Sequence, residues 1–366
     1  MHLTLTPFTL HKRVPLTISR GTTARNTNLW VRIAAEGIEG WGEATPFSVE
    51  AGQGLTTSQL QQELTALSPL IQNYHPLERQ RLAPLLAQLS TAARAAVDTA
   101  LQDWCGKRAG LPLWQLWGLD LAPIPPTSLT IGISSPPTAA ARVAQWQAQI
   151  GAKVFKVKLG SPQGIAADQA MFTAVQDMAP DASFSVDANG GWDLEGAIAM
   201  AHWLADRGVC HLEQPLAASN RGDFAALYGR SPLPIFADES CFTAQDIPAL
   251  AAVVHGINIK LMKAGGLSEA KAMIHTAQSH NLRLMFGCYG NSTLANTALS
   301  HLAPYADYID LDSHLNLLDD PFQGATLDGA GRLMPPHRPG LGITANSPPP
   351  FDAPVAATPS STHPDP

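Results

Sequence analysis

Residues 153–160 read KVFKVKLG, and this stretch indicates how the larger part of the chain folds. Among its apolar residues stand Lys156 and Lys158, which face the same side of a strand because side chains alternate with a period of two. A strand buried on both faces cannot hold unpaired ammonium groups without a large desolvation cost. Either this is an edge strand with its lysines in water, or anions from elsewhere in the chain face them.

Similar short, β-branched runs recur from about residue 124 onward, and Ala-rich helical stretches separate them. The runs are SLTIGI, VFKVKL, FSVDANG, VCHLEQP, PIFADES, INIKLMK, LRLMFGCY and YIDLDS. Eight strands that alternate with helices predict the α/β class, as a parallel (β/α)8-type TIM barrel rather than an open sheet.

Ionisable residues stand near the carboxyl ends of five successive runs, about one strand-plus-helix unit apart. They are Lys158, Asp187, Glu213, Asp238 and Lys260. Because the carboxyl ends of barrel strands share one rim, we predict that these side chains converge on a single site. The alternative, a set of unrelated surface charges, does not explain the regular spacing.

The three carboxylates of this set would repel one another strongly, and a divalent cation between them would remove that cost. Hard oxygen ligands favour Mg²⁺, which keeps open positions for substrate oxygens. We therefore predict a Mg²⁺ site formed by Asp187, Glu213 and Asp238. Asn189, on the same face as Asp187, is expected to support that carboxylate or to contact the substrate.

The lysines would then face carboxylates and a metal-bound substrate. A crowded cationic environment lowers a lysine pKa, so we predict Lys158 as a base and Lys156 as its electrostatic tuner beside the substrate. In INIKLMKAGG, Lys260 and Lys263 fall on opposite faces of a continuous strand. We predict that Lys260 points inward and Lys263 lies at an exposed or anion-binding turn. Lysines on the second and sixth strands would move a proton α to a carboxylate between two faces.

Composition narrows the class of protein. With 366 residues, 45% of them hydrophobic, the chain can build two domains around a large core. A net charge of −7 and a pI near 5.9 disfavour nucleic acid or an anionic membrane as partner, and favour a small molecule. We expect a cytoplasmic protein because no leader-like start or 18-residue apolar run occurs. Four scattered cysteines disfavour disulfides and zinc, and we expect core thiols.

Three parts of the chain differ in character. Residues 1–120 mix strand-like and helical segments and predict an α+β capping domain packed against the barrel mouth. Residues 121–344 would hold the barrel, the catalytic site and a C-terminal segment. Residues 345–366 are rich in Pro, Ala, Ser and Thr and predict a flexible tail. The sequence is compatible with a homo-oligomer and does not determine the oligomeric state.

Five motifs together resemble the enolase superfamily, in its muconate-lactonizing-enzyme-like branch. They are KVK at 156–158, DAN at 187–189, EQP at 213–215, ADES at 237–240 and IKLMKAGG at 259–266. The resemblance implies that Asp187, Glu213 and Asp238 bind Mg²⁺ and that Lys158 and Lys260 are the two acid/base residues. GEATP at 42–46 and PGLGI at 339–343 are similar to segments of the same family.

The last run, YIDLDS, resembles the Asp-x-Asp segment of dipeptide epimerases. The resemblance implies that Asp310 and Asp312 hold the α-ammonium group of a dipeptide whose C-terminal residue is epimerised. For Ala-Glu, a peptidoglycan fragment and the best-known substrate class, Arg20 in SRGTTARN would bind the glutamate carboxylate. The alternatives are that one of the two aspartates merely caps the following helix and that Arg20 is an exposed loop residue without a role.

One segment departs from the family pattern. The seventh run ends FGCYGNSTL, with Tyr289 and Asn291 where many relatives would carry an acidic ending, so a preference other than Ala-Glu stays open. An o-succinylbenzoate synthase or an N-acylamino acid racemase would use the same metal and lysines, but its substrate offers no ammonium to Asp310 and Asp312. A non-catalytic binding protein on the same fold is the remaining alternative.

Overall fold

The computed structural model describes residues 1–50, 53–220 and 222–346. Apart from its first two residues, the predicted flexible tail at 345–366 lies outside these described residues. Within them, no helix combines the length and the apolar character that crossing a membrane requires.

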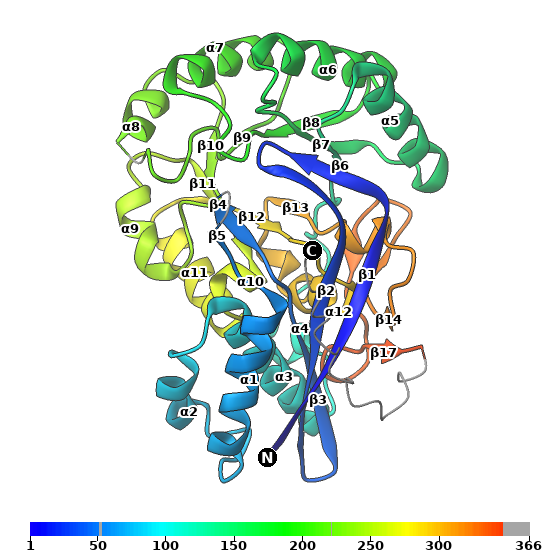
Figure 1. Ribbon diagram of the computed structural model, residues 1–366, viewed down its shortest axis with the longest axis vertical. Coiled ribbons are helices and arrows are strands. Elements are labelled where there is room, and N and C mark those ends of the chain that lie inside the picture. Colours follow the sequence, from blue (N-terminus) through cyan, green and yellow to red (C-terminus); the bar gives the residue numbers. More distant parts are fainter. Residues whose placement is uncertain (51–52, 221, 347–366) are drawn as a thin grey trace, which may run out of the picture.

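The N-terminal part is a three-stranded antiparallel sheet covered by helices. The strands β1 (His2–Ile18), β2 (Gly21–Ala35) and β3 (Ile38–Ala44) lie side by side in this order. The strand β1 has 17 residues and β2 has 15. The first two strands therefore form a long hairpin, which reaches from the bottom of the molecule to the barrel (Figure 1).

The helices α1 (Thr57–Ile71) and α3 (Thr91–Ala109) pack beside this sheet, and α2 (Arg79–Leu86) belongs to the same part of the chain. Contact between α3 and β3 depends on two glycines of the GWGEATP segment. A Cβ atom on Gly40 would lie 1.9 Å from the carbonyl oxygen of Ala100, and one on Gly42 would lie 2.0 Å from that of Ala96. These positions admit no side chain, because the helix backbone lies directly on the strand. The short elements β4 (Ser48–Glu50), β5 (Gln53–Gly54) and α4 (Leu113–Leu116) complete this part.

The second part is a barrel of eight strands, all parallel. The strands are β6 (Leu129–Ile131), β7 (Val154–Lys158), β8 (Ser183–Asp187), β9 (Leu212–Glu213), β10 (Ile235–Ala237), β11 (Gly256–Lys260), β12 (Arg283–Gly287) and β13 (Tyr308–Asp310). A parallel bridge between Thr127 and Ile309, with a 2.8 Å hydrogen bond from the Ser128 amide to the Ile309 carbonyl, joins the first strand to the last. The predicted fold is confirmed, and the edge-strand interpretation of β7 is wrong because β6 and β8 flank it.

The outer arc seen in Figure 1 is formed by the helices between residues 136 and 228, and helices connect successive strands around the barrel. They are α5 (Pro136–Ile150), α6 (Ile165–Met178), α7 (Leu194–Ala205), α8 (Asp223–Tyr228), α9 (Ile247–Leu250), α10 (Leu261–Ala264), α11 (Leu267–Ser279) and α12 (Thr293–Ser300). Three 3₁₀ turns are η1 (Ala244–Asp246), η2 (Ala303–Tyr305) and η3 (Ser313–Asn316). After β13 the chain continues into η3 and the short strands β14 (Phe322–Gln323), β15 (Thr326–Leu327), β16 (Leu333–Met334) and β17 (Thr344–Ala345) instead of a barrel helix.

The strand register places the functional side chains at one height. Lys158 pairs with Asp187, and Asp187 pairs with Glu213, across neighbouring strands. Around the barrel, Lys260 pairs with Gly287, and Gly287 pairs with Asp310. Residues that end their strands are therefore neighbours on one rim, as the parallel topology requires.

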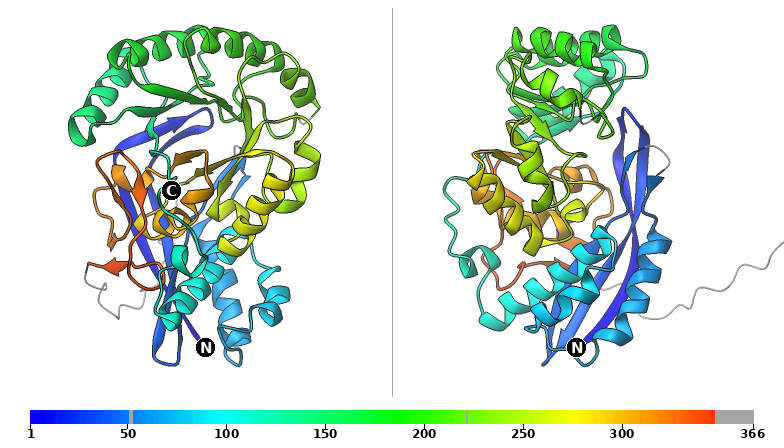
Figure 2. Two further views of the ribbon diagram at one scale, coloured as in Figure 1. Left: turned by 180° about the vertical axis from the view of Figure 1, so that it is seen from behind. Right: turned by 90° about the vertical axis from the view of Figure 1, so that its left-hand side faces the viewer.

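The N-terminal part lies against this rim. The β1–β2 hairpin runs along one side of the barrel in the edge-on view (Figure 2). Its tip is anchored by a 2.9 Å hydrogen bond from the Ile133 amide to the Thr17 carbonyl. Near the other end, Phe322 of the C-terminal segment packs edge-on against Trp30, with ring centroids 5.1 Å apart.

The four cysteines differ in exposure. Cys241 is buried, and Cys105 and Cys288 are half-buried, but Cys210 is exposed. The prediction of core thiols is therefore wrong for Cys210. It stands in the loop before β9, where its side chain leaves the barrel interior.

Candidate active site

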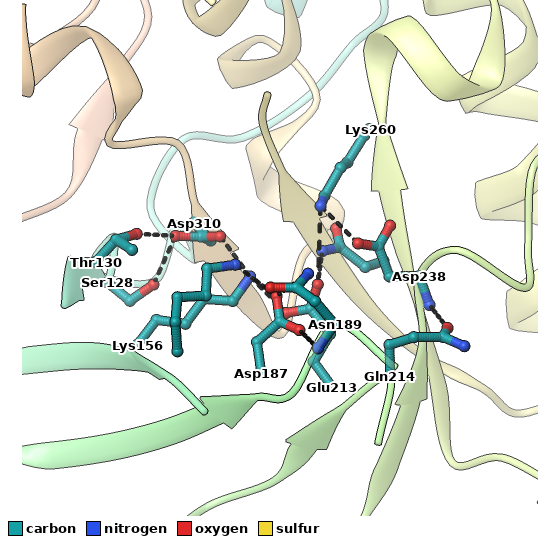
Figure 3. Close-up of polar contacts among 12 residues, drawn as sticks. Ser128, Thr130, Lys156, Asp187, Asn189, Glu213, Gln214, Asp238, Lys260 and Asp310 are labelled. Carbon is teal, nitrogen blue, oxygen red and sulfur yellow. Dashed lines mark hydrogen bonds and ion pairs between the residues drawn. The ribbon is translucent and has the colours of Figure 1, made fainter. Parts of the chain in front are cut away.

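Three carboxylates gather at the carboxyl ends of β8, β9 and β10. One oxygen atom from each of Asp187, Glu213 and Asp238 lies within 4.8 Å of the other two (Figure 3). All three side chains are buried, with at most 1% of their surface exposed. Three buried like charges at this spacing repel one another unless cations compensate them.

The pKa shifts of these groups reveal how that compensation is distributed. Burial and the charge of Asp187 raise the pKa of Glu213 to about 7. Burial opposes ionisation of Asp187 and Asp238 as well, but the neighbouring lysines outweigh it and lower both pKa values. The positive groups near Glu213 do not fully balance its negative charge. A divalent cation such as Mg²⁺, which prefers hard oxygen ligands, would supply the missing positive charge.

Lys156 is the fully buried counter-ion of this cluster. Its Nζ atom lies 2.5 Å from Glu213 Oε2, 2.6 Å from Asp310 Oδ2 and 3.3 Å from Asp187 Oδ2. Burial opposes its charge, but the carboxylates of Asp310, Glu213 and Asp187 raise its pKa well above the ordinary value. The prediction that anions from elsewhere in the chain face Lys156 is therefore confirmed. Carboxylates from three other strands surround the ammonium and keep it charged.

Lys158 ends the same strand and faces open space. Its Nζ atom lies 2.5 Å from Asp187 Oδ2, and the residue lines the main cavity. Lys156 and Lys158 point to the same side of β7, as the period of two predicts. The first reaches the carboxylate cluster and the second reaches the cavity.

Lys260 and Lys263 both contact Asp238. The Nζ atom of Lys260 lies 2.6 Å from Asp238 Oδ2, and that of Lys263 lies 2.6 Å from Asp238 Oδ1. Lys263 also donates to the carbonyl oxygens of Asp238 and Asn258 and is fully buried. Of the two predicted alternatives for Lys263, the exposed position is wrong, and the anion that it binds is the Asp238 carboxylate. The strand ends at Lys260, and the helical turn α10 brings Lys263 back to the same carboxylate.

Lys260 carries the ammonium group that pairs with Asp238. Burial opposes its charge, but Asp238 and further anionic neighbours raise its pKa well above the ordinary value. Asp238, one of the three carboxylates that would bind the metal ion, is therefore the partner of the Lys260 ammonium.

Asp310 and Asp312 line the cavity beside β6 and β7. Asp310 accepts hydrogen bonds from Lys156, Ser128 and Thr130, whereas Asp312 Oδ2 accepts from the Thr130 amide at 2.7 Å. The Asp312 side chain makes no capping hydrogen bond to η3, which it precedes, so helix capping does not explain it.

The two aspartates differ in charge. Burial opposes ionisation of Asp310, but Lys156 outweighs it and lowers the Asp310 pKa. Burial and the charge of Asp310 raise the pKa of Asp312 to about 6. A substrate cation would therefore complete the charge balance at Asp312.

Arg20 reaches this site from the tip of the β1–β2 hairpin. Its guanidinium lies 2.9 Å from Glu239 Oε1 and donates to the carbonyl oxygen of Asn189 at 2.9 Å. Only 16% of its side chain is exposed, so it is not an idle surface residue. An acidic substrate side chain would have to compete with Glu239 for this arginine.

Asn189 supports Asp187 from the loop after β8. Its amide donates to Asp187 Oδ1 at 2.8 Å, and its side-chain nitrogen lies 3.2 Å from both Asp187 Oδ2 and Glu239 Oε1. A left-handed backbone conformation, with φ of 44°, turns the side chain back toward the carboxylate. Asparagine tolerates that conformation better than most residues.

A cavity of about 710 Å³ opens above these groups, between the hairpin and the barrel rim. Lys158, Lys260, Asp310 and Asp312 line it together with apolar residues of the N-terminal part. Tyr289, in the segment that departs from the family pattern, forms part of its wall, whereas Asn291 is buried at 2% exposure.

Two polar residues of the site were not singled out from the sequence. Glu239 pairs with Arg20, and the Asn258 side chain donates to Glu213 Oε1 at 2.7 Å. Asn258 stands two residues before Lys260 in β11, so the period of two could have placed it on the inward face. The partner of Glu239 is Arg20, which lies in a loop more than 200 positions away in the chain, so no local sequence pattern predicts the pair.

Family models cover nearly the whole described chain. Residues 2–118 match the mandelate racemase/muconate lactonizing enzyme N-terminal domain, and residues 138–348 match the enolase C-terminal domain-like family.

Curated relatives and solved structures agree with these matches. A hydrophobic dipeptide epimerase from a Flavobacteria bacterium is 42% identical over 93% of this chain and 97% of its own. The L-Ala-D/L-Glu epimerase of Bacteroides thetaiotaomicron is 34% identical over 94% of this chain and 88% of its own. The dipeptide epimerase of Enterococcus faecalis V583, solved with Mg and L-Leu-L-Tyr, has a TM-score of 0.87 and 29% identity, covering 94% of this chain and 99% of that one.

Proposed function

The chain belongs to the enolase superfamily, in the mandelate racemase/muconate lactonizing enzyme branch, and on that premise we propose that it is a Mg²⁺-dependent dipeptide epimerase. In this proposal Asp187, Glu213 and Asp238 hold the metal. Lys158 and Lys260 are the acid/base residues that invert the α-carbon of the C-terminal residue.

The observation that carries the proposal is the placement of the two lysines. Lys158 ends the second strand of the barrel and Lys260 ends the sixth, so in a closed barrel of eight strands they come from opposite sides. Both line the same cavity, next to the acidic triad. A group bound between them is accessible to one amine on each face, which is what epimerisation without release of the carbanion requires.

The residues of the chain divide the work as follows. A bound Mg²⁺ would polarise the substrate carboxylate and stabilise the negative charge of the enediolate. One lysine removes the α-proton, and the electron pair of the broken C–H bond moves into the carboxylate. The other lysine then donates its own proton to the opposite face. Lys156 and Lys263, both fully buried, hold the metal-binding carboxylates in place with fixed positive charge.

A dipeptide also carries an ammonium group, and we assign its recognition to Asp310 and Asp312. Both carboxylates line the cavity, and Asp312 has no lysine or arginine within salt-bridge distance among the described residues. Burial and the neighbouring charge of Asp310 raise its pKa. An incoming ammonium would supply a positive counter-charge.

For the side chain at the inverted carbon we propose a hydrophobic group rather than glutamate. The arginine that would bind an acidic side chain, Arg20, already pairs with Glu239. Apolar side chains of the N-terminal part, including Leu16, Phe47 and Leu55, line the cavity. Relatives that are 42% and 40% identical are named hydrophobic dipeptide epimerases, which supports the same substrate class.

The proposal is tested by deuterium incorporation from D2O. The protein with Mg²⁺ is incubated with a panel of dipeptides that includes L-Leu-L-Tyr and L-Ala-L-Glu, and mass spectrometry detects a gain of a single deuterium. We expect exchange in a subset dominated by hydrophobic C-terminal residues, and its loss when EDTA removes the metal. Exchange confined to L-Ala-L-Glu would support the epimerase and overturn the hydrophobic preference.

Two further substrates separate the rival functions. Turnover of the o-succinylbenzoate precursor or racemisation of N-acylamino acids, without exchange in any dipeptide, would overturn the proposal in favour of those activities. Lack of exchange in all substrates by folded, Mg²⁺-loaded protein would point to a binding protein. The variant Lys158→Ala/Lys260→Ala is the matched blank for every assay.

Part of the proposal concerns the cell. We propose a cytoplasmic location, supported by the exposed thiol of Cys210, since exposed thiols persist in a reducing compartment. Fractionation of the producing cells with an antibody against the protein tests this, and recovery in an extracellular fraction would contradict it.

A further inference from the structure

We propose that Tyr289 is a positioning residue for Lys260, so that the lysine on one face of the substrate is held by an aromatic ring that the lysine on the other face lacks. This inference rests on the proposed function, because it assigns Lys260 to one of two proton transfers. It concerns the segment CYGNS, at which the chain departs from its family pattern.

The ring of Tyr289 lies directly beside the Lys260 ammonium. The Nζ atom is 4.7 Å from the ring centroid, within the distance at which a cation and an aromatic face attract each other. On its other side the same atom lies 2.6 Å from Asp238 Oδ2. The ammonium is thus held between a carboxylate and a ring, and these two contacts restrict the direction in which its three N–H groups point.

The ring itself is held in place from the N-terminal part. Phe47 stacks on Tyr289 with ring centroids 4.5 Å apart and an interplanar angle of 20°. Phe47 follows the GEATP segment, whose Glu43 accepts hydrogen bonds from the amide and hydroxyl groups of Ser292. Glu43 and Phe47, four residues apart in the chain, therefore both hold the loop that carries Tyr289.

The backbone of that loop has little freedom to move the ring away. Glu43 is 1% exposed and also accepts from the Ala295 amide at 3.1 Å, so its carboxylate caps the start of α12. The hydroxyl-bearing ring is fixed at its base by this cap and on its face by Phe47. A ring so constrained can define the position of a flexible lysine side chain.

Lys158 is held differently. Its Nζ atom contacts Asp187 Oδ2 at 2.5 Å, and no aromatic ring among the described residues lies over it. Loss of the Tyr289 ring should therefore affect the two proton transfers unequally. In each transfer the Cα–H bond breaks, the proton moves to the lysine nitrogen, and the electron pair enters the substrate carboxylate.

The experiment measures early deuterium incorporation in D2O separately for the two epimers of one substrate dipeptide. Lys260→Ala first identifies the epimer whose α-proton Lys260 removes. In Tyr289→Leu we expect exchange of that epimer to slow about tenfold, and exchange of the other to stay within about twofold of wild type. Tyr289→Phe keeps the ring and serves as the matched control, with both rates near wild type.

Phe47→Leu supplies a second variant that leaves Tyr289 intact. We expect a smaller slowing, on the order of threefold, restricted to the Lys260 epimer. Equal slowing of both epimers in Tyr289→Leu, or no slowing of either, would overturn the inference while the proposed function stands. A wild-type protein that exchanges neither epimer of any dipeptide would instead overturn the proposed function and, with it, the role of Lys260.

Discussion

Strands β7 and β11 each bring two lysines to the acidic cluster, but they do so by different backbone routes. On β7, Lys156 and Lys158 are two residues apart and share a face of one extended strand. On the other side, Lys260 is the last residue of β11. Lys263 lies in the turn of α10, which brings it to the same carboxylate as Lys260, that of Asp238. In both cases one lysine lines the cavity and the other is fully buried.

The two pairs of lysines thus differ in backbone geometry. What they share is that their positive charges balance the buried carboxylates. The buried lysines differ in what they hold. Lys156 contacts carboxylates from three strands, whereas Lys263 contacts one carboxylate and two backbone carbonyls. We infer that the cavity lysines transfer protons and the buried lysines fix the carboxylates that bind the metal.

The largest effect on the rate of epimerisation is expected from substitution of the two lysines that line the cavity, Lys158 and Lys260. Lys158→Ala and Lys260→Ala should each lower the rate of epimerisation by about 10²–10⁴-fold, because each removes one acid/base group. Proton exchange should persist in a single epimer, a different one for each variant. Deuterium incorporation from each epimer measures this. Loss of exchange from both epimers in both variants would contradict a division of labour between the two faces.

The buried lysines should affect stability more than chemistry. Lys156→Met leaves several carboxylates without their counter-ion, and breaking a buried ion pair costs about 3–5 kcal/mol of unfolding free energy. Lys263→Met should cost less, because fewer carboxylates lose a partner. Urea unfolding in the absence of Mg²⁺ measures both. A larger loss for Lys263→Met would reverse the roles assigned to the two sides.

The aspartates that line the cavity beside β7 extend the comparison to the binding of the substrate. Asp312→Asn should raise the KM for a dipeptide about 10- to 100-fold with a smaller change in kcat, as a hydrogen bond to a charged group is worth about 1.5–3 kcal/mol. An N-acetylated dipeptide, which lacks the ammonium, should not distinguish the variant from wild type. Steady-state kinetics with both compounds tests this.

The smallest effect is a pH dependence on the same side. The pKa of Asp312 is raised to about 6, so its carboxylate is charged above that pH and gains a proton below it. The attraction for the substrate ammonium is complete only well above pH 6, where the carboxylate is fully charged, and KM should rise as the pH falls through 6. The ratio of kcat/KM between wild type and Asp312→Asn isolates this titration, because the metal-binding carboxylates are common to both. A ratio independent of pH between 5 and 8 would refute the assignment.

Prediction from the sequence succeeded where the chain is periodic. Parallel strands at regular intervals bring their ends to one rim, so the spacing of Asp187, Glu213 and Asp238 was enough to group them. The predicted orientation of Lys263 was wrong, because the two-residue period of a strand does not indicate that a helical turn begins directly after Lys260. The raised pKa of Lys156 also could not be read from the sequence, since the carboxylates around it come from strands distant in the chain.

The sequence alone therefore determined the barrel, the inward-facing lysines and the acidic triad, because each follows from local alternation repeated around a closed sheet. Only the tertiary structure decided which neighbours those groups have. The pairing of Arg20 with Glu239 and the stacking of Phe47 on Tyr289 join the N-terminal part to the barrel rim. Such contacts depend on how two separately patterned regions pack together, and short-range sequence periodicity carries no record of that.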